Sequence, residues 1–227
     1  MEKICYIFLL FLMYSFIGWI IEMIDIYIEE RKIINRGFCV GPYCPIYGIG
    51  VLLIVNFLKD YTDSWLVLFV MSMFICMVLE YFTSFVMEKL FKARWWDYSN
   101  KKFNLNGRIC LETTIPFGLG GLIVMYIVNP FLEGILNLLS SKAIIILGIG
   151  LMVLFVSDLV ISFIAILKVR NVRFDKIKDS TEEMNMKVRE YLMKHSFLTR
   201  RLMQSFPNLK FKIEKFKNRR KKDNKSK

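Results

Sequence analysis

The chain has 227 residues, of which 55% are hydrophobic, and it carries a formal net charge of +12. Soluble domains are about 45–50% apolar, and the excess here falls in blocks close to the ~20 residues that cross a bilayer, which excludes an ordinary soluble domain. The basic charge is confined to one end, because residues 168–227 hold 20 Lys and Arg against 7 Asp and Glu.

The apolar blocks predict an all-α polytopic membrane protein with five transmembrane helices in residues 1–168, followed by a cytosolic basic tail in residues 169–227. The first block is too long for the core of a signal peptide and lacks a small-residue cleavage site, so we expect it to stay as a helix. The expected spans lie at about residues 4–28, 45–58, 65–91, 109–132 and 143–167.

A short motif occurs twice, as NRGFCVGPYCPIYGIG at 35–50 and as NGRICLETTIPFGLGG at 106–121. In both copies a Cys is followed six residues later by Pro, and an aromatic residue and G-x-G close the motif. Each copy joins two apolar segments, which predicts a duplicated helix–loop–helix unit (about 4–58 and 65–132) with the helix at 143–167 as an extra element. Chance similarity is the alternative, since Gly and Pro are common in membrane helices.

The Gly and Pro residues of these motifs predict helix breaks. Interrupted helices expose backbone polar groups, which a membrane protein tolerates only inside protein or along a wet cavity. Breaks at matching positions of two halves are typical of a binding site, whereas tight helix packing without a ligand is the alternative. The residues concerned are Gly41, Pro42, Pro45, Gly48, Gly50, Pro116 and Gly118.

The distribution of basic residues predicts the orientation. With the N-terminus outside and the C-terminus in the cytoplasm, the inner loops hold nine Lys and Arg residues besides the tail, and the outer segments hold three. Positive charge favours the cytoplasmic side. Both motifs then face the cytosol, and the two repeats run parallel.

Carboxylates in apolar segments are costly and usually face the protein interior. Glu22 and Glu80 occupy matching places in the two repeats, and Glu112 lies at the entry of the fourth segment. Arg36 and Arg108 precede the second helix of each repeat. We expect these five residues to surround a polar cavity open to the cytosol, where the arginines hold an anionic substrate and the glutamates move protons or bind a cation. Alternatively, the five form ion pairs that lock the helices together. Further acidic residues in or near the spans are Asp25, Glu88 and Asp158.

The loop between the third and fourth spans contains the aromatic run WWDY at 95–98. Aromatic residues at this position are typical of an interfacial belt, or they form a lid over the cavity. Trp96, Asp97 and Asn106 therefore complete the predicted binding site.

No cofactor or metal is expected. The residues Cys39, Cys44, Cys110 and His195 do not have the spacing of a zinc site, and the sequence contains no P-loop motif.

In the tail, Ser180-x-x-Glu183 is a capping box, and apolar residues follow it at helical spacing up to Pro207. This predicts a basic amphipathic helix that lies on anionic lipids or pairs with a second copy. A solvated tail without a specific role is the alternative, and no nucleic-acid partner is expected.

Four stretches together resemble the bacterial CmpB-like family of ABC-transporter type IV permeases, and they cover about residues 17–121. They are IGWIIE at 17–22, the first motif at 35–50, LEYFTSFVMEKLFKARWWDYS at 79–99 and FNLNGRICL at 103–111. The resemblance implies an integral protein of the cell membrane with a role in transport, and it assigns no catalytic residues. An ATPase would have to be a separate subunit, and a homo-oligomer is the other expected assembly.

The sequence leaves three functions open. A transporter permease component is the first. A membrane-embedded enzyme acting on a lipid or an anionic headgroup is the second, and a non-catalytic membrane scaffold is the third.

Overall fold

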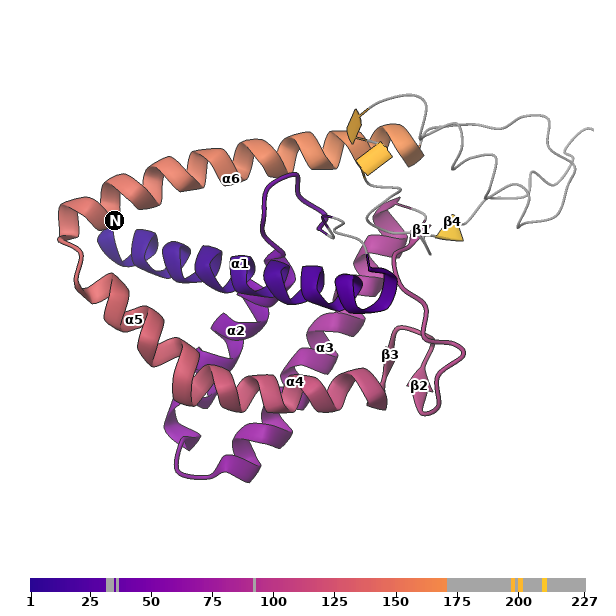
Figure 1. Cartoon of the computed structure of the whole chain (residues 1–227), viewed down its shortest axis with the longest axis horizontal. Coiled ribbons are helices and arrows are strands. Elements are labelled where there is room, and N and C mark those ends of the chain that lie inside the picture. Colours follow the sequence, from indigo (N-terminus) through magenta and orange to yellow (C-terminus); the bar gives the residue numbers. More distant parts are fainter. Residues whose placement is uncertain are drawn as a thin grey trace, which may run out of the picture.

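The structure is a computed structural model, and it describes residues 1–31, 35, 37–91, 93–170, 197–198, 200–201 and 210–211. The described chain is mostly helical (Figure 1). The α-helices are α1 (Glu2–Glu30), α2 (Pro45–Leu58), α3 (Trp65–Phe91), α4 (Leu111–Ile123), α5 (Asn129–Asn137) and α6 (Ser141–Arg170). A 3-10 turn, η1 (Lys59–Tyr61), follows α2, and a π-helical turn, η2 (Val124–Val128), joins α4 to α5.

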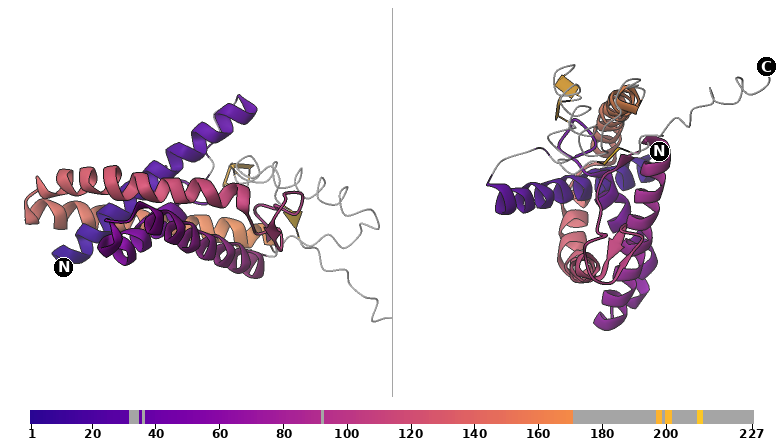
Figure 2. Two further views of the ribbon diagram at one scale, coloured as in Figure 1. Left: turned by 90° about the horizontal axis from the view of Figure 1, so that it is seen from below. Right: turned by 90° about the vertical axis from the view of Figure 1, so that its right-hand side faces the viewer.

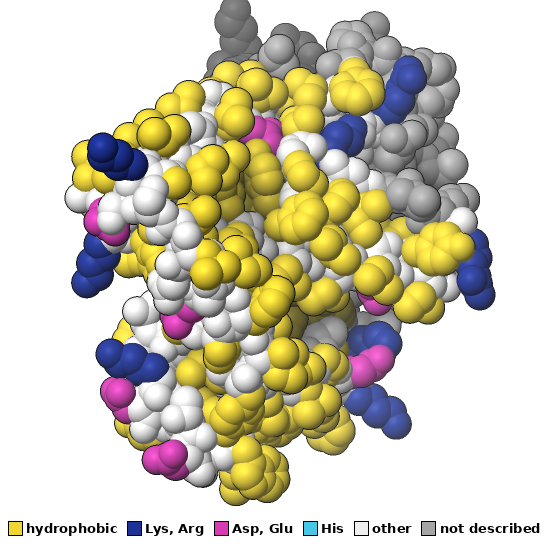
Figure 3. All heavy atoms as spheres, turned by 60° about the vertical axis from the view of Figure 1, so that its left-hand side comes forward, with side chains coloured by type: hydrophobic (Ala, Val, Ile, Leu, Met, Phe, Trp, Pro, Cys, Tyr) yellow, Lys and Arg dark blue, Asp and Glu magenta, His cyan; other side chains and the backbone are white. Residues whose placement is uncertain are grey.

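Four helical stretches are long and apolar enough to cross a membrane, namely Glu2–Ile28, Trp65–Phe91, Leu111–Asn137 and Ser141–Leu167. The third of these comprises α4, η2 and α5. Hydrophobic side chains cover most of the face shown in Figure 3, as expected where lipid surrounds the helices. The four stretches therefore support the predicted class, an all-α protein that crosses the membrane several times.

The helix α2 is shorter than a full span. Its 14 residues cover about 21 Å, against about 30 Å for the hydrocarbon core. It starts beside the middle of α1, where the Cys44 N–H donates to the carbonyl of Ser15 at 2.9 Å. Cys44 is extended, as a residue before proline should be, and Pro45 is the first helical residue. The prediction of five transmembrane helices is thus not confirmed, because α2 is not among the four stretches that are long enough to cross a membrane.

The helices pack as two hairpins, α1 with α2 and α3 with α4, and α6 lies along α1 (Figures 1 and 2). Small residues at the helix contacts allow the helices to approach each other closely. A Cβ added at Gly48 would lie 2.6 Å from the Phe11 carbonyl oxygen, and one added at Gly121 would overlap the side chain of Ser72.

The predicted helix breaks are only partly correct. The chain is non-helical at Gly41 and Pro42, and α2 begins at Pro45, whereas Gly48, Gly50 and Gly118 lie inside helices. Pro116 also lies inside α4, which continues to Ile123. Proline removes the N–H that would bond the carbonyl of Glu112, but Glu112 is exposed, so solvent or headgroups can replace that single bond.

Two small antiparallel sheets lie at one end of the bundle. β1 (Ala93–Arg94) pairs with β4 (Lys210–Phe211), and β2 (Asn104–Leu105) pairs with β3 (Ile109–Cys110). Asn106 and Gly107 lie in the turn between β2 and β3 with φ angles of 55° and 65°, which are typical of Asn-Gly turns.

Both motifs lie toward the end of the bundle that carries these sheets (Figure 1). The N-terminus and the turns α2–α3 and α5–α6 lie toward the other end. The amphipathic helix predicted after Ser180 falls largely outside the described residues.

Candidate functional site

The first motif loop, residues 37–44, is bonded to a carboxylate in the middle of α6. Asp158 accepts hydrogen bonds from the N–H groups of Val40 at 2.9 Å and Gly41 at 2.7 Å. The Tyr43 hydroxyl donates to the same carboxylate, and Ser162 donates to it at 3.1 Å. Backbone groups that no helix satisfies are thus satisfied by a side chain from another span.

The same loop is fixed to α1 and to the C-terminal segment. The Trp19 indole donates to the Asn35 side chain at 2.7 Å, and Asn35 donates to the Val40 carbonyl at 3.2 Å. Arg201 donates to the carbonyls of Gly37, at 3.1 Å, and Cys39.

Glu22 and Glu80 are two predicted site residues that the fold brings close to each other. The two carboxylates are close enough to interact electrostatically. Each accepts a hydrogen bond from a tyrosine, Glu22 from Tyr47 at 2.7 Å and Glu80 from Tyr98 at 3.2 Å. Burial, and after it the charge of Glu80, raises the pKa of Tyr98 well above its usual range, so the phenol keeps its proton and acts as the donor.

Glu80 differs from the other acidic residues near it. It is only 7% exposed, and its Oε2 atom has no hydrogen-bond partner among the described residues. A buried charge of this kind is costly unless something compensates it.

Glu80 belongs to a polar stripe along α3. Five residues at intervals of four form a slanted row along this otherwise apolar helix. The row extends over about 24 Å and turns by about 160° around the helix axis from its first residue to its last. All but Cys76 are buried. The stripe consists of Ser72, Cys76, Glu80, Ser84 and Glu88.

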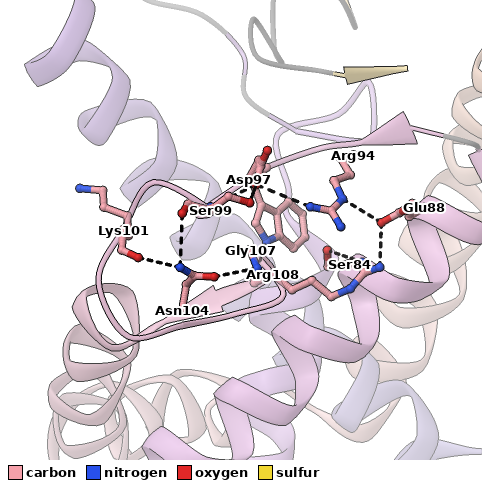
Figure 4. Close-up of polar contacts among 10 residues, drawn as sticks. Ser84, Glu88, Arg94, Asp97, Ser99, Lys101, Asn104, Gly107 and Arg108 are labelled. Atoms are coloured by element: carbon pink, nitrogen blue, oxygen red, sulfur yellow. Dashed lines mark hydrogen bonds and ion pairs between the residues drawn. The ribbon is translucent and has the colours of Figure 1, made fainter. Parts of the chain in front are cut away.

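The end of the stripe nearest the sheets is an ion-pair network (Figure 4). Arg108 is 8% exposed and donates to Glu88 at 2.7 Å and to Ser84 at 3.1 Å. Arg94 donates to the same Glu88 oxygen at 3.0 Å and lies 3.6 Å from Asp97. Arg108 thus forms a buried ion pair, but its partner is Glu88 and not one of the five residues that the sequence analysis grouped together.

Three other predicted binding residues hold the loop between α3 and α4. The Trp96 indole donates to the carbonyl of Arg108 at 2.9 Å. Asp97 accepts from the Ser99 N–H at 3.1 Å, and Asn106 donates to the Tyr81 hydroxyl at 3.0 Å. These contacts hold the α3–α4 loop in its observed conformation.

Glu112 lies away from this cluster, exposed on α4, where it pairs with Lys101 at 2.9 Å. Arg36 lies outside the described residues. Within the part of the chain that the structure describes, no three His, Cys, Asp or Glu residues are grouped as a metal site would require.

A groove of about 450 Å³ lies between α1, α5, α6 and the first motif loop. Its walls are apolar apart from Tyr43, so it is not the predicted polar cavity. The lining residues are Leu12, Met13, Phe16, Ile17, Pro42, Tyr43, Leu132, Leu151, Leu154 and Phe155.

Sequence reasoning did not place Asp158, Glu88, Tyr47, Tyr98 or Arg201 in the site. The first two carried a signal, because each is an acidic residue in an apolar segment. Tyr47 lies in the first motif and Tyr98 in the aromatic run at 95–98, but the sequence did not indicate their partners, which are distant along the chain. Arg201 carried no signal.

Residues 9–163 match the CmpB family, described as "Putative ABC-transporter type IV". The matched region includes both motifs and Asp158. No curated protein and no solved structure shows significant similarity to the chain.

The pairing of Arg108 with Glu88 predicts a large cost when Arg108 is replaced by Ala. Removing one partner of a buried ion pair costs about 3–5 kcal/mol, and we expect the lower end because Arg94 still bonds Glu88. Lys101→Ala, which breaks the exposed pair with Glu112, should cost about 0–1 kcal/mol. Reversible unfolding in mixed micelles measures both, and equal losses would contradict the assignment of Arg108 as a lock.

Proposed function

Because the chain belongs to the CmpB family of type IV ABC transporters, we propose that it is a transporter permease in which Glu22 and Glu80 bind a cationic solute or a coupling proton. The observation that carries this proposal is Glu80, an acidic side chain buried in a membrane span with one oxygen unpartnered among the described residues. Ionisable residues inside membranes typically mark substrate or ion pathways.

The contacts of the neighbouring groups support a cation rather than an anion at this site. A second carboxylate, Glu22, lies within electrostatic range of Glu80. The cations that bond the polar side chains of α3, Arg108 and Arg94, are committed to Glu88 and Ser84. A proton or a bound cation would therefore compensate the negative charge of Glu80, and an anionic substrate would meet repulsion there.

The polar stripe on α3 supports a route to the site. Ser84 and Glu88 continue the stripe from Glu80 toward the end where both motif loops lie, and Ser72 continues it in the other direction. We propose that a cytosol-facing polar cavity opens along this face. Tyr47 and Tyr98 hold the two carboxylates in place.

The proposed topology has the N-terminus outside and the C-terminus in the cytoplasm of a multi-pass cell-membrane protein. In this arrangement the loop at 37–44 and α2 form one interrupted crossing, and two parallel hairpins make up the repeat. Support comes from the excess of basic residues near both motifs and from the start of α2 at the middle of α1.

The proposed partners follow from the family and from the charge. ABC transporters require an ATPase, which would be a separate subunit here or act on a homo-oligomer of this chain. The basic tail is proposed to bind anionic lipids.

The topology is tested by cysteines introduced at two exposed positions, Lys101→Cys in the α3–α4 loop and Lys142→Cys before α6. A membrane-impermeant maleimide should label Cys at 101 only in inside-out vesicles and Cys at 142 only in right-side-out vesicles. The unsubstituted chain serves as the background. The reverse pattern, or labelling of both positions from one side, would refute the topology.

The function is tested in inverted membrane vesicles, which retain native partner subunits, incubated with ATP and an extract of small cellular metabolites. Vesicles that contain the wild-type chain should accumulate at least one cationic solute, measured by mass spectrometry. Glu80→Gln should reduce this by about tenfold or more, because interactions with charged groups are worth about 1.5–3 kcal/mol.

Glu2→Gln, an exposed change at the start of α1, is the control and should transport normally. Equal uptake by vesicles that lack the chain would contradict the proposal. A change in vesicle lipids without uptake would favour the membrane-embedded enzyme instead.

A further inference from the structure

The first motif loop also presents acceptors to a cation. The carbonyl oxygens of Gly37 and Cys39 both accept from the guanidinium of Arg201. Burial lowers the pKa of the Arg201 guanidinium, and the Asp158 carboxylate, which lies within electrostatic range, acts against this shift and favours the charged form. Two carbonyls and a carboxylate thus face one positively charged group at the end of the bundle where both motifs lie.

We propose that this end of the loop is a binding site for organic cations that carry N–H donors, such as guanidinium compounds and primary amines. In the structure, the side chain of Arg201 from the same chain occupies this site. The site is separate from the Glu22–Glu80 pair and does not depend on its function. Carbonyl and carboxylate oxygens only accept hydrogen bonds. They therefore match N–H donors, and they would repel anions.

The contacts of Arg201 support its role as a displaceable occupant. Arg201 lies 31 residues after the end of α6 at Arg170, and its guanidinium donates to two backbone carbonyls of the loop. A free cation with N–H donors offers the same bonds and can therefore compete with it. The pairing of β4 with β1 is a second contact that returns the same segment to the α3–α4 loop.

The reactivity of the Cys39 thiol, which lies near Arg201, can report whether the site is occupied. Cys39, whose carbonyl binds the guanidinium, has a side chain that is fully buried. The thiol should therefore react very slowly with maleimides while the site is filled. The other titratable groups that face Arg201 are Asp158, Cys44 and Tyr43.

The test measures alkylation of Cys39 by peptide mass spectrometry, with the full chain in lipid nanodiscs. Arg201→Ala should increase the labelling rate by about tenfold or more, since loss of hydrogen bonds from a charged group costs about 1.5–3 kcal/mol. Millimolar methylguanidinium should restore protection in a saturable manner. Tetramethylammonium at equal concentration should not, because it has no N–H donor.

Two variants control for misfolding. Arg200→Ala, at an exposed position beside Arg201, should leave the labelling rate unchanged. Arg201→Lys keeps a cationic donor and should leave Cys39 largely protected. The proposal is overturned if Arg201→Ala leaves Cys39 protected, or if protection is lost and methylguanidinium does not restore it.

Discussion

The carboxylate of Asp158 allows a non-helical segment to lie inside a bundle of membrane helices. Backbone groups in such a segment must find partners within the protein, and Asp158 receives the N–H groups of Val40 and Gly41. With the loop held against α6, Cys44 reaches the middle of α1 and α2 starts there. Tyr47, in the first turn of α2, then reaches Glu22. The position of the Glu22–Glu80 pair thus depends on Asp158, an acidic residue in α6.

The charged residues around the two motifs separate into two roles. Arg108, Arg94 and Glu88 neutralise one another and fix the α3–α4 loop. Tyr47 donates to Glu22 and Tyr98 donates to Glu80, and such bonds orient a carboxylate without neutralising it. A permease needs both a rigid frame and a site whose charge a ligand can balance, and this division supplies the two. The acceptor groups at Gly37 and Cys39 extend the same preference for positive charge to the loop.

The sequence predicted the long helices well, because unbroken apolar runs of this length have few alternatives. It also predicted that Glu22 and Glu80 would be close, from their matching places in the two hairpins. It placed Glu112 wrongly relative to them, since residue spacing does not reveal which side of α4 faces α3. The bounds of α2 (Pro45–Leu58) match the span predicted at 45–58, whereas its start beside the middle of α1 depends on Ser15 and Asp158, which are distant in the sequence. The Asn106-Gly107 turn carried a hairpin signal that its position between two membrane spans obscured.

Hydrogen–deuterium exchange in the segment 37–44 tests most directly whether Asp158 holds the loop. The account predicts slow exchange at Val40 and Gly41 in the wild-type chain and exchange faster by about tenfold or more in Asp158→Ala, since each lost bond is made to a charged acceptor. Ser157→Ala removes only a bond within α6, from the Ser157 hydroxyl to the Val153 carbonyl at 2.8 Å, and should change nothing. Fast exchange in the wild-type chain, or an unchanged rate in Asp158→Ala, would contradict the account.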